Sequence, residues 1–166
     1  SSDLAEAGAV WVFDPQSVAE EEPSWWWNPL SYVKNEATAG NMAQHFANGS
    51  REPGTKPDAY FDPAGQNLLK AFLLAASLDS APVTQVYTWL TRPHDERPAE
   101  LLRAAGYDLL ADMVTGHIRE PEKQRAGVYG TARQMVSCLT DREVSRWVTP
   151  ARDTTVDTDP RPQFVP

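Results

Sequence analysis

Residues 61–78, FDPAGQNLLKAFLLAASL, give the clearest indication of the fold. As a helix, this segment is apolar around much of its circumference, which is typical of a helix enclosed by its neighbours. Asp62 followed by Pro63 is a common helix start, with the aspartate as the N-cap and the proline in the first turn. We therefore predict a central core helix from Asp62 to about Leu78, and its apolar positions include Leu68, Leu69, Phe72, Leu73 and Ala76.

Helical spacing continues on both sides of this segment. Apolar residues three and four apart predict a helix from about residue 31 to Gly49, with Gly49 as a left-handed cap. Its apolar face holds Ala39, Met42, Ala43, Phe46 and Ala47. Further helices are predicted over 82–90, 98–106, 107–118 and 120–139, followed by a short one that Asp141 caps. Their apolar residues include Leu101, Leu102, Leu109, Leu110, Met113, Val114, Val128, Ala132, Met135, Val136 and Leu139.

The two ends of the chain differ from this helical middle. Residues 9–13, AVWVF, are a continuous apolar run that predicts a strand buried on both faces, and Asp14-Pro15 ends it. Residues 25–30, WWWNPL, are predicted to form an aromatic loop. Residues 149–166 are predicted to form an extended tail with four prolines. A lone strand cannot satisfy its own backbone hydrogen bonds. We therefore expect a mainly α fold, an irregular bundle of six to seven helices inserted at the edge of a larger sheet.

The amino-acid composition excludes several classes of function. The chain has 166 residues, 41% hydrophobic and 23% charged, with a net charge of −8. This charge argues against a domain that wraps duplex DNA. The single cysteine, Cys138, excludes a disulfide framework, and the three histidines show no zinc-ligand spacing. We expect no metal site, no membrane-spanning segment and no direct membrane contact. Because the chain starts at Ser1 without an initiator methionine, we expect a piece of a larger protein.

Two short motifs, in order, resemble a known family. Val10 to Gln16 (VWVFDPQ) looks like the strand that follows the Walker A helix in type IV secretion coupling proteins of the TraG/TraD kind. Residues 28–30, Asn-Pro-Leu, match the element that comes next in that family. Residues 37–46 and 61–74 resemble the first two helices of the family's inserted all-alpha domain. The tryptophan-rich segments suggest the actinobacterial branch.

The resemblance implies a division of the chain. Residues 1–16, with the strand over 9–13, are the edge of a host ATPase domain; residues 17–149 are the all-alpha domain; residues 150–166 return toward the host. The parent is then a hexameric DNA-translocating ATPase that binds ATP and magnesium and is associated with the inner membrane, with this piece on its cytoplasmic side. Asp14 would lie near the nucleotide site of the host.

No catalytic residue is predicted in the chain itself. The glycine-rich phosphate loop of the Walker A motif is missing from the sequence. Val10 to Asp14 resembles a Walker B strand, but Pro15 stands where an acidic residue normally follows, so a structural strand end is the favoured interpretation. We therefore expect no ATP hydrolysis by this piece and no cofactor bound to it.

Candidate partner-binding residues come from two places. Arg119, Lys123 and Arg125 can share a basic helix face, which would suit an acidic segment of a relaxase or DNA. The alternative is a solvated face with local ion pairs. Trp25 and Trp26 suit a partner interface, or else packing between the helical domain and its host.

The resemblance implies a function without catalysis: a substrate-recruiting domain that contacts the relaxosome, meaning the relaxase and its bound transfer strand. Two alternatives stay open. One is a single-strand DNA-binding module at the channel entrance of the motor, for which Trp147 beside Arg142 and Arg146 is the local candidate. The other is a purely architectural helical domain.

Overall fold

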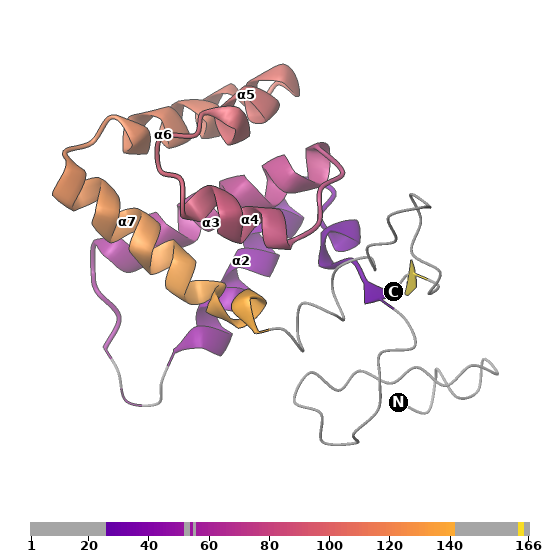
Figure 1. The fold of residues 1–166 in the computed structure, drawn as a ribbon, viewed down its shortest axis with the longest axis horizontal. Helices are drawn as coiled ribbons and strands as arrows, with labels where there is room; N and C mark the ends of the chain where they lie inside the picture. The colour runs from indigo at the N-terminus through magenta and orange to yellow at the C-terminus, as the bar shows by residue number, and fades with distance from the viewer. Residues whose placement is uncertain (1–25, 52–53, 55, 142–162, 165–166) are drawn as a thin grey trace.

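The computed structural model describes residues 26–51, 54, 56–141 and 163–164, and this part of the chain is mainly helical (Figure 1). The predicted helical bundle is thereby confirmed. The described helices are η1 (Pro29–Tyr32), α2 (Glu36–Ser50), α3 (Phe61–Leu78), α4 (Thr84–Leu90), α5 (Arg97–Ala104), α6 (Asp108–Ile118), α7 (Glu122–Met135) and η2 (Ser137–Thr140). Two short strands, β1 (Trp26–Trp27) and β2 (Gln163–Phe164), complete the described elements.

Helix α3 is the centre of the bundle, as its sequence predicts. It packs against α2, α4, α5, α6 and α7, and also against η1. The Phe72 ring is 1% exposed and lies edge-on between Trp89 and Tyr129, with ring centroids 5.9 and 6.0 Å away. Because neighbours cover α3 on several sides, its interior residues are buried on every turn. The buried residues of α3 are Gly65, Leu68, Leu69, Ala71, Phe72, Leu73, Leu74, Ala75 and Ala76.

The start of α3 differs from the prediction. The helix begins at Phe61, and Asp62 lies inside its first turn. The cap comes from Asp58, whose Oδ1 accepts the backbone N–H of Phe61 at 2.7 Å and that of Tyr60 at 2.8 Å. These two bonds favour the charged carboxylate and hold the pKa of Asp58 below its usual value. The predicted Asp62 cap was wrong because Asp58 satisfies these amides one turn earlier.

Helix α2 also has different ends from those expected. It begins at Glu36, after a capping box in which Asn35 and Thr38 exchange side-chain and backbone hydrogen bonds. It then continues through Gly49 to Ser50. Within the described residues, the glycines with positive φ are Gly54 and Gly106, so the predicted left-handed cap at Gly49 was wrong. The buried stripe of α2, Ala39, Ala43 and Ala47, lies where the prediction put it.

Two predicted helices in the second half need correction. Leu109 was placed among the apolar residues of the 107–118 helix, but it is 86% exposed, whereas Leu110 and Val114 are buried. The helix predicted over 120–139 ends at Met135, and the backbone continues from Val136 into η2. Its inner residues are buried as expected: Val128, Ala132, Met135, Val136 and Leu139.

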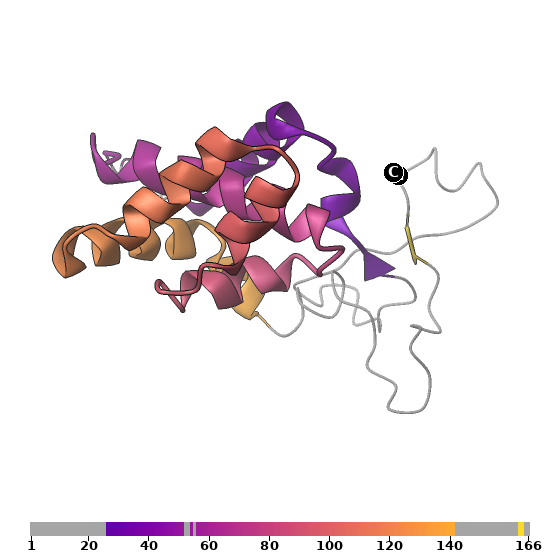
Figure 2. The ribbon, with the colours of Figure 1, turned by 90° about the horizontal axis from the view of Figure 1, so that it is seen from above.

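The strands β1 and β2 pair in parallel, with Trp26 opposite Gln163 and Trp27 opposite Phe164. Trp26 and Trp27 therefore lie in a strand. Pro29 and Leu30 lie in η1, whose first turn Asn28 caps, so the loop predicted over 25–30 was wrong at these four residues. The two paired strands lie beside the bundle, at the opposite end of its long axis from the α6–α7 turn (Figures 1 and 2). The strand predicted over 9–13, the helix after Asp141 and most of the extended tail fall outside the described residues.

Candidate protein-docking site

The first turns of α3 and α7 meet at the end of the bundle away from β1 and border a shallow, open hollow of about 390 Å³. Gly127 lets the two helices approach, because a Cβ at this position would run into the Phe61 ring. The ring therefore lies directly on the backbone of α7. Five residues line the hollow: Tyr60, Phe61, Pro121, Lys123 and Gln124.

Tyr60 is the exposed aromatic of this hollow, and both ends of its side chain are held. Its ring packs edge-on against Phe61, with centroids 5.1 Å apart and planes at 80°. Its hydroxyl accepts a hydrogen bond from Gln124 Nε2 at 2.6 Å. Tyr60 as a residue is nevertheless 48% exposed. A fixed, half-exposed aromatic ring costs little side-chain entropy when a partner covers it, which suits a binding contact.

The predicted basic residues divide into two groups in the structure. Arg119 and Lys123 are exposed and form no ion pair with any described residue. Lys123 also lines the hollow. Arg125 is half-buried and donates from Nη1 to the carbonyl oxygens of Ile118 at 3.1 Å and Glu120 at 2.9 Å. Arg125 therefore closes the C-terminal end of α6, and its guanidinium is already engaged.

A second side-chain contact, besides the hydrogen bonds of Arg125, stabilises the connection between α6 and α7. His117 Nδ1 and Glu120 Oε1 lie 3.0 Å apart, and both side chains are largely buried. The other carboxylate oxygen of Glu120 is buried and has no partner among the described atoms. This carboxylate is thus turned inward, so it does not neutralise the exposed cations Arg119 and Lys123.

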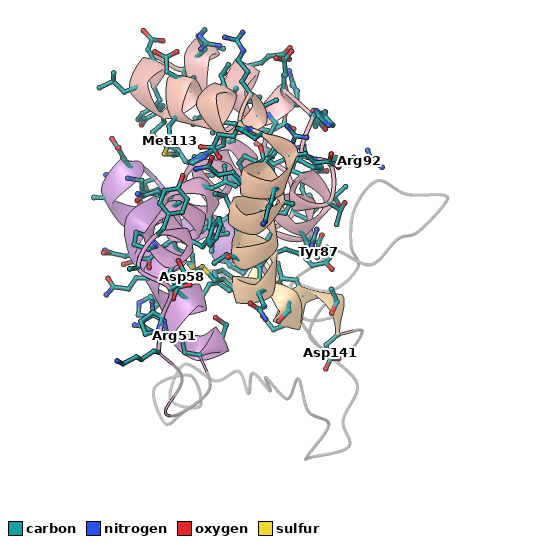
Figure 3. The ribbon with its side chains drawn as sticks, turned by 90° about the vertical axis from the view of Figure 1, so that its left-hand side faces the viewer. Arg51, Asp58, Tyr87, Arg92, Met113 and Asp141 are labelled. Atoms are coloured by element: carbon teal, nitrogen blue, oxygen red, sulfur yellow. The ribbon has the colours of Figure 1, made fainter. Side chains whose placement is uncertain are left out.

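A second, more polar hollow of about 370 Å³ lies where α2 ends and α3 begins. Arg51 and Asp58 both line it and lie in the same region of the molecule (Figure 3). Asp58 already accepts two backbone N–H groups there, so this hollow mainly surrounds a helix cap. The described residues include no group of three or more His, Cys, Asp or Glu side chains arranged to hold a metal.

Several predicted site residues cannot be placed. Asp14 and Trp25 lie outside the described residues, as do Arg142, Arg146 and Trp147. Trp26 lies in β1, paired with Gln163. No described residue is therefore assigned to ATP or magnesium.

Sequence reasoning missed Tyr60, Phe61 and Gln124. The available signal was the aromatic pair immediately before Asp62-Pro63, because large side chains at a helix start often contact the element that crosses it. Which element that is cannot be read from local sequence, since Gln124 is 64 residues away from Tyr60.

Comparison of the chain with protein-family models, with characterised proteins and with solved structures gave no match. Among the described helices, none combines the length and the apolar character needed to span a membrane.

Proposed function

We propose that the helical part of this chain is a protein-recruiting domain, and specifically the all-alpha domain of a TraG/TraD-like conjugative coupling protein that contacts the relaxase. The observation that carries the recruiting role is the hollow around Tyr60. It presents a fixed, half-exposed aromatic ring at the end of the bundle that lies away from β1 and β2. Aromatic side chains in such settings contribute strongly to protein–protein binding.

The pairing of β1 with β2 supports an inserted position. Parallel strands need a long crossover connection, and here the described helices lie between the two strands in the sequence. A sheet of two strands with two residues each is too small to be stable alone. Further strands of a parent protein would complete it, and the helices would then project from the edge of that sheet with the Tyr60 hollow at their far end.

The recruiting role is tested by calorimetric titration of the 166-residue chain with the relaxase encoded beside it, with and without the transfer-origin strand. Saturable binding to the relaxase alone is expected. Binding that requires the DNA strand would favour the single-strand DNA-binding alternative. No binding in either titration would contradict recruitment by this domain.

Matched tyrosine variants locate the contact. Tyr60→Ala removes the ring in the hollow, and Tyr32→Ala removes a ring of nearly equal exposure, 47% against 48%, in η1 at the other end of the bundle. Tyr60→Ala should weaken relaxase binding about ten-fold or more, as the loss of a central aromatic contact does. Tyr32→Ala should leave it unchanged. Equal effects of the two variants would exclude the hollow as the docking site.

A further inference from the structure

We propose that the Tyr60 hollow recognises an extended protein segment in which an apolar side chain stands next to a carboxylate. This inference rests on the proposed recruiting function and names the chemistry of the segment that is recruited. The apolar side chain would enter between Tyr60, Phe61 and Pro121, and the carboxylate would pair with Lys123 at the rim.

The residues that line the hollow explain why an apolar side chain would bind there. Three of the five lining residues are Tyr60, Phe61 and Pro121, and these present rings to the hollow. The edge-on contact with Phe61 and the hydrogen bond from Gln124 hold Tyr60 in place before any partner arrives. The hollow is therefore pre-formed, and an aliphatic or aromatic side chain can bury apolar surface there without first ordering the site.

The charged residues around the hollow explain why a carboxylate would bind beside the apolar side chain. Lys123 is the one charged residue among the five that line it, and no described carboxylate pairs with its ammonium group. Arg119, the residue that follows the last turn of α6, is a second exposed cation. It forms no ion pair with any described residue. Glu120 is held inward by His117, and Glu122 does not line the hollow. Asp58 and Asp62 flank Tyr60 and Phe61 in the sequence but line the neighbouring hollow between α2 and α3. Lys123 is therefore the charged group of this lining that can pair with an anionic partner.

A nucleic acid fits these observations less well. Single-stranded DNA binds along grooves in which cations follow several phosphates and aromatic rings stack on successive bases. Here one lysine lines the hollow, and the accessible ring, Tyr60, packs edge-on against Phe61 instead of offering a series of open faces. One apolar side chain beside one carboxylate matches this lining more closely.

The test is an NMR titration of the isotope-labelled 166-residue chain with a blocked peptide in which one leucine lies between two glutamates. Two control peptides replace the glutamates by glutamine, or the leucine by serine. We expect amide shifts confined to residues 60–61 and 121–124. The glutamine peptide should bind about two- to five-fold more weakly, as expected for an exposed ion pair, and the serine peptide more weakly still.

Variants of Lys123 test whether the preference for the glutamate peptide comes from an ion pair with this residue or from a general attraction of the chain to acidic peptides. Lys123→Gln should remove the difference between the glutamate and glutamine peptides, and Lys123→Glu should favour a peptide with lysines in place of the glutamates. Lys34→Gln changes an exposed lysine that lies between η1 and α2 and does not line the hollow, so it should leave the difference intact. Far-UV circular dichroism confirms that each variant is folded.

The outcomes distinguish this inference from the recruiting function. Equal binding of the glutamate and glutamine peptides, shifts outside the hollow, or tighter binding of a thymidine oligonucleotide to the same amides would overturn it. If the relaxase still binds in a Tyr60-dependent way, recruitment stands and only the carboxylate preference fails. If the relaxase does not bind, the recruiting function fails whatever the peptides do.

Discussion

Gly65 lies where α3 contacts α7, and its missing side chain sets how closely these helices pack. A Cβ at this position would lie 2.9 Å from Thr131 Cγ2 and 3.2 Å from the backbone nitrogen of Ala132. We predict that Gly65→Ala lowers the free energy of unfolding by about 1–2 kcal/mol, because overpacking outweighs the gain in helix propensity. Gly116→Ala, where a Cβ meets open space, should instead raise it by about 0.5–1 kcal/mol. Urea unfolding of both variants measures this, and equal effects would contradict close packing at Gly65.

Tyr129 carries a buried hydroxyl without a partner among the described atoms. Burial raises the pKa of this phenol well above its usual range. Because the ring is 1% exposed and the hydroxyl gains no hydrogen bond in compensation, we predict that Tyr129→Phe raises the free energy of unfolding at pH 7 by up to about 1 kcal/mol. A loss of stability would show instead that the hydroxyl is hydrogen-bonded, for example to a buried water.

The same residue predicts the behaviour at alkaline pH. The phenol releases its proton near pH 10 in the unfolded chain but only at higher pH in the folded one. The unfolded state then binds fewer protons than the folded state, so the stability is unaffected below about pH 9 and falls as the pH rises past 10. Tyr129→Phe should make this fall shallower, which thermal melts between pH 8 and pH 11 can measure.

At the scale of elements, the turn from α6 to α7 depends on Arg125. Its guanidinium is half-buried and satisfies the carbonyl oxygens of Ile118 and Glu120. We predict that Arg125→Ala lowers the free energy of unfolding by about 1–2 kcal/mol, since two charged hydrogen bonds to part-buried carbonyl oxygens are lost. Arg133→Ala, in the same helix but exposed and without a described ion pair, should change it by less than about 0.5 kcal/mol. If the two variants are equally stable, Arg125 is a surface residue like Arg133.

The element predictions succeed where several turns agree and fail at the helix ends. The span of α3 and the alanine stripe of α2 follow from repeated apolar spacing, which averages over many residues. The ends depend on single hydrogen bonds, and more than one residue can supply them. Asp58 and Asp62 are both plausible caps for α3, and the structure uses Asp58.

For the molecule as a whole, the buried residues that the structure describes lie between Leu30 and Leu139, and all of them except Val33, Val83 and Val136 lie in helices. These helices bury one continuous cluster of apolar side chains. We predict that a fragment of residues 28–141 retains the helical circular dichroism signal and melts cooperatively within a few degrees of the 166-residue chain. A fragment that binds hydrophobic dyes or melts without cooperativity would show that the omitted segments contribute to the core.

Apolar periodicity acts within each segment, so the amino-acid sequence predicts the helical class, the central position of α3 and the burial of the inner residues of α7. Which segments meet follows only from how the helices pack in the folded chain. The folded chain joins Tyr60 to Gln124 across 64 positions, pairs Trp26 with Gln163, and turns Arg125 inward while Lys123 stays exposed. The Tyr60 hollow forms where helices cross one another, and the crossing depends on side-chain packing between residues far apart in the chain.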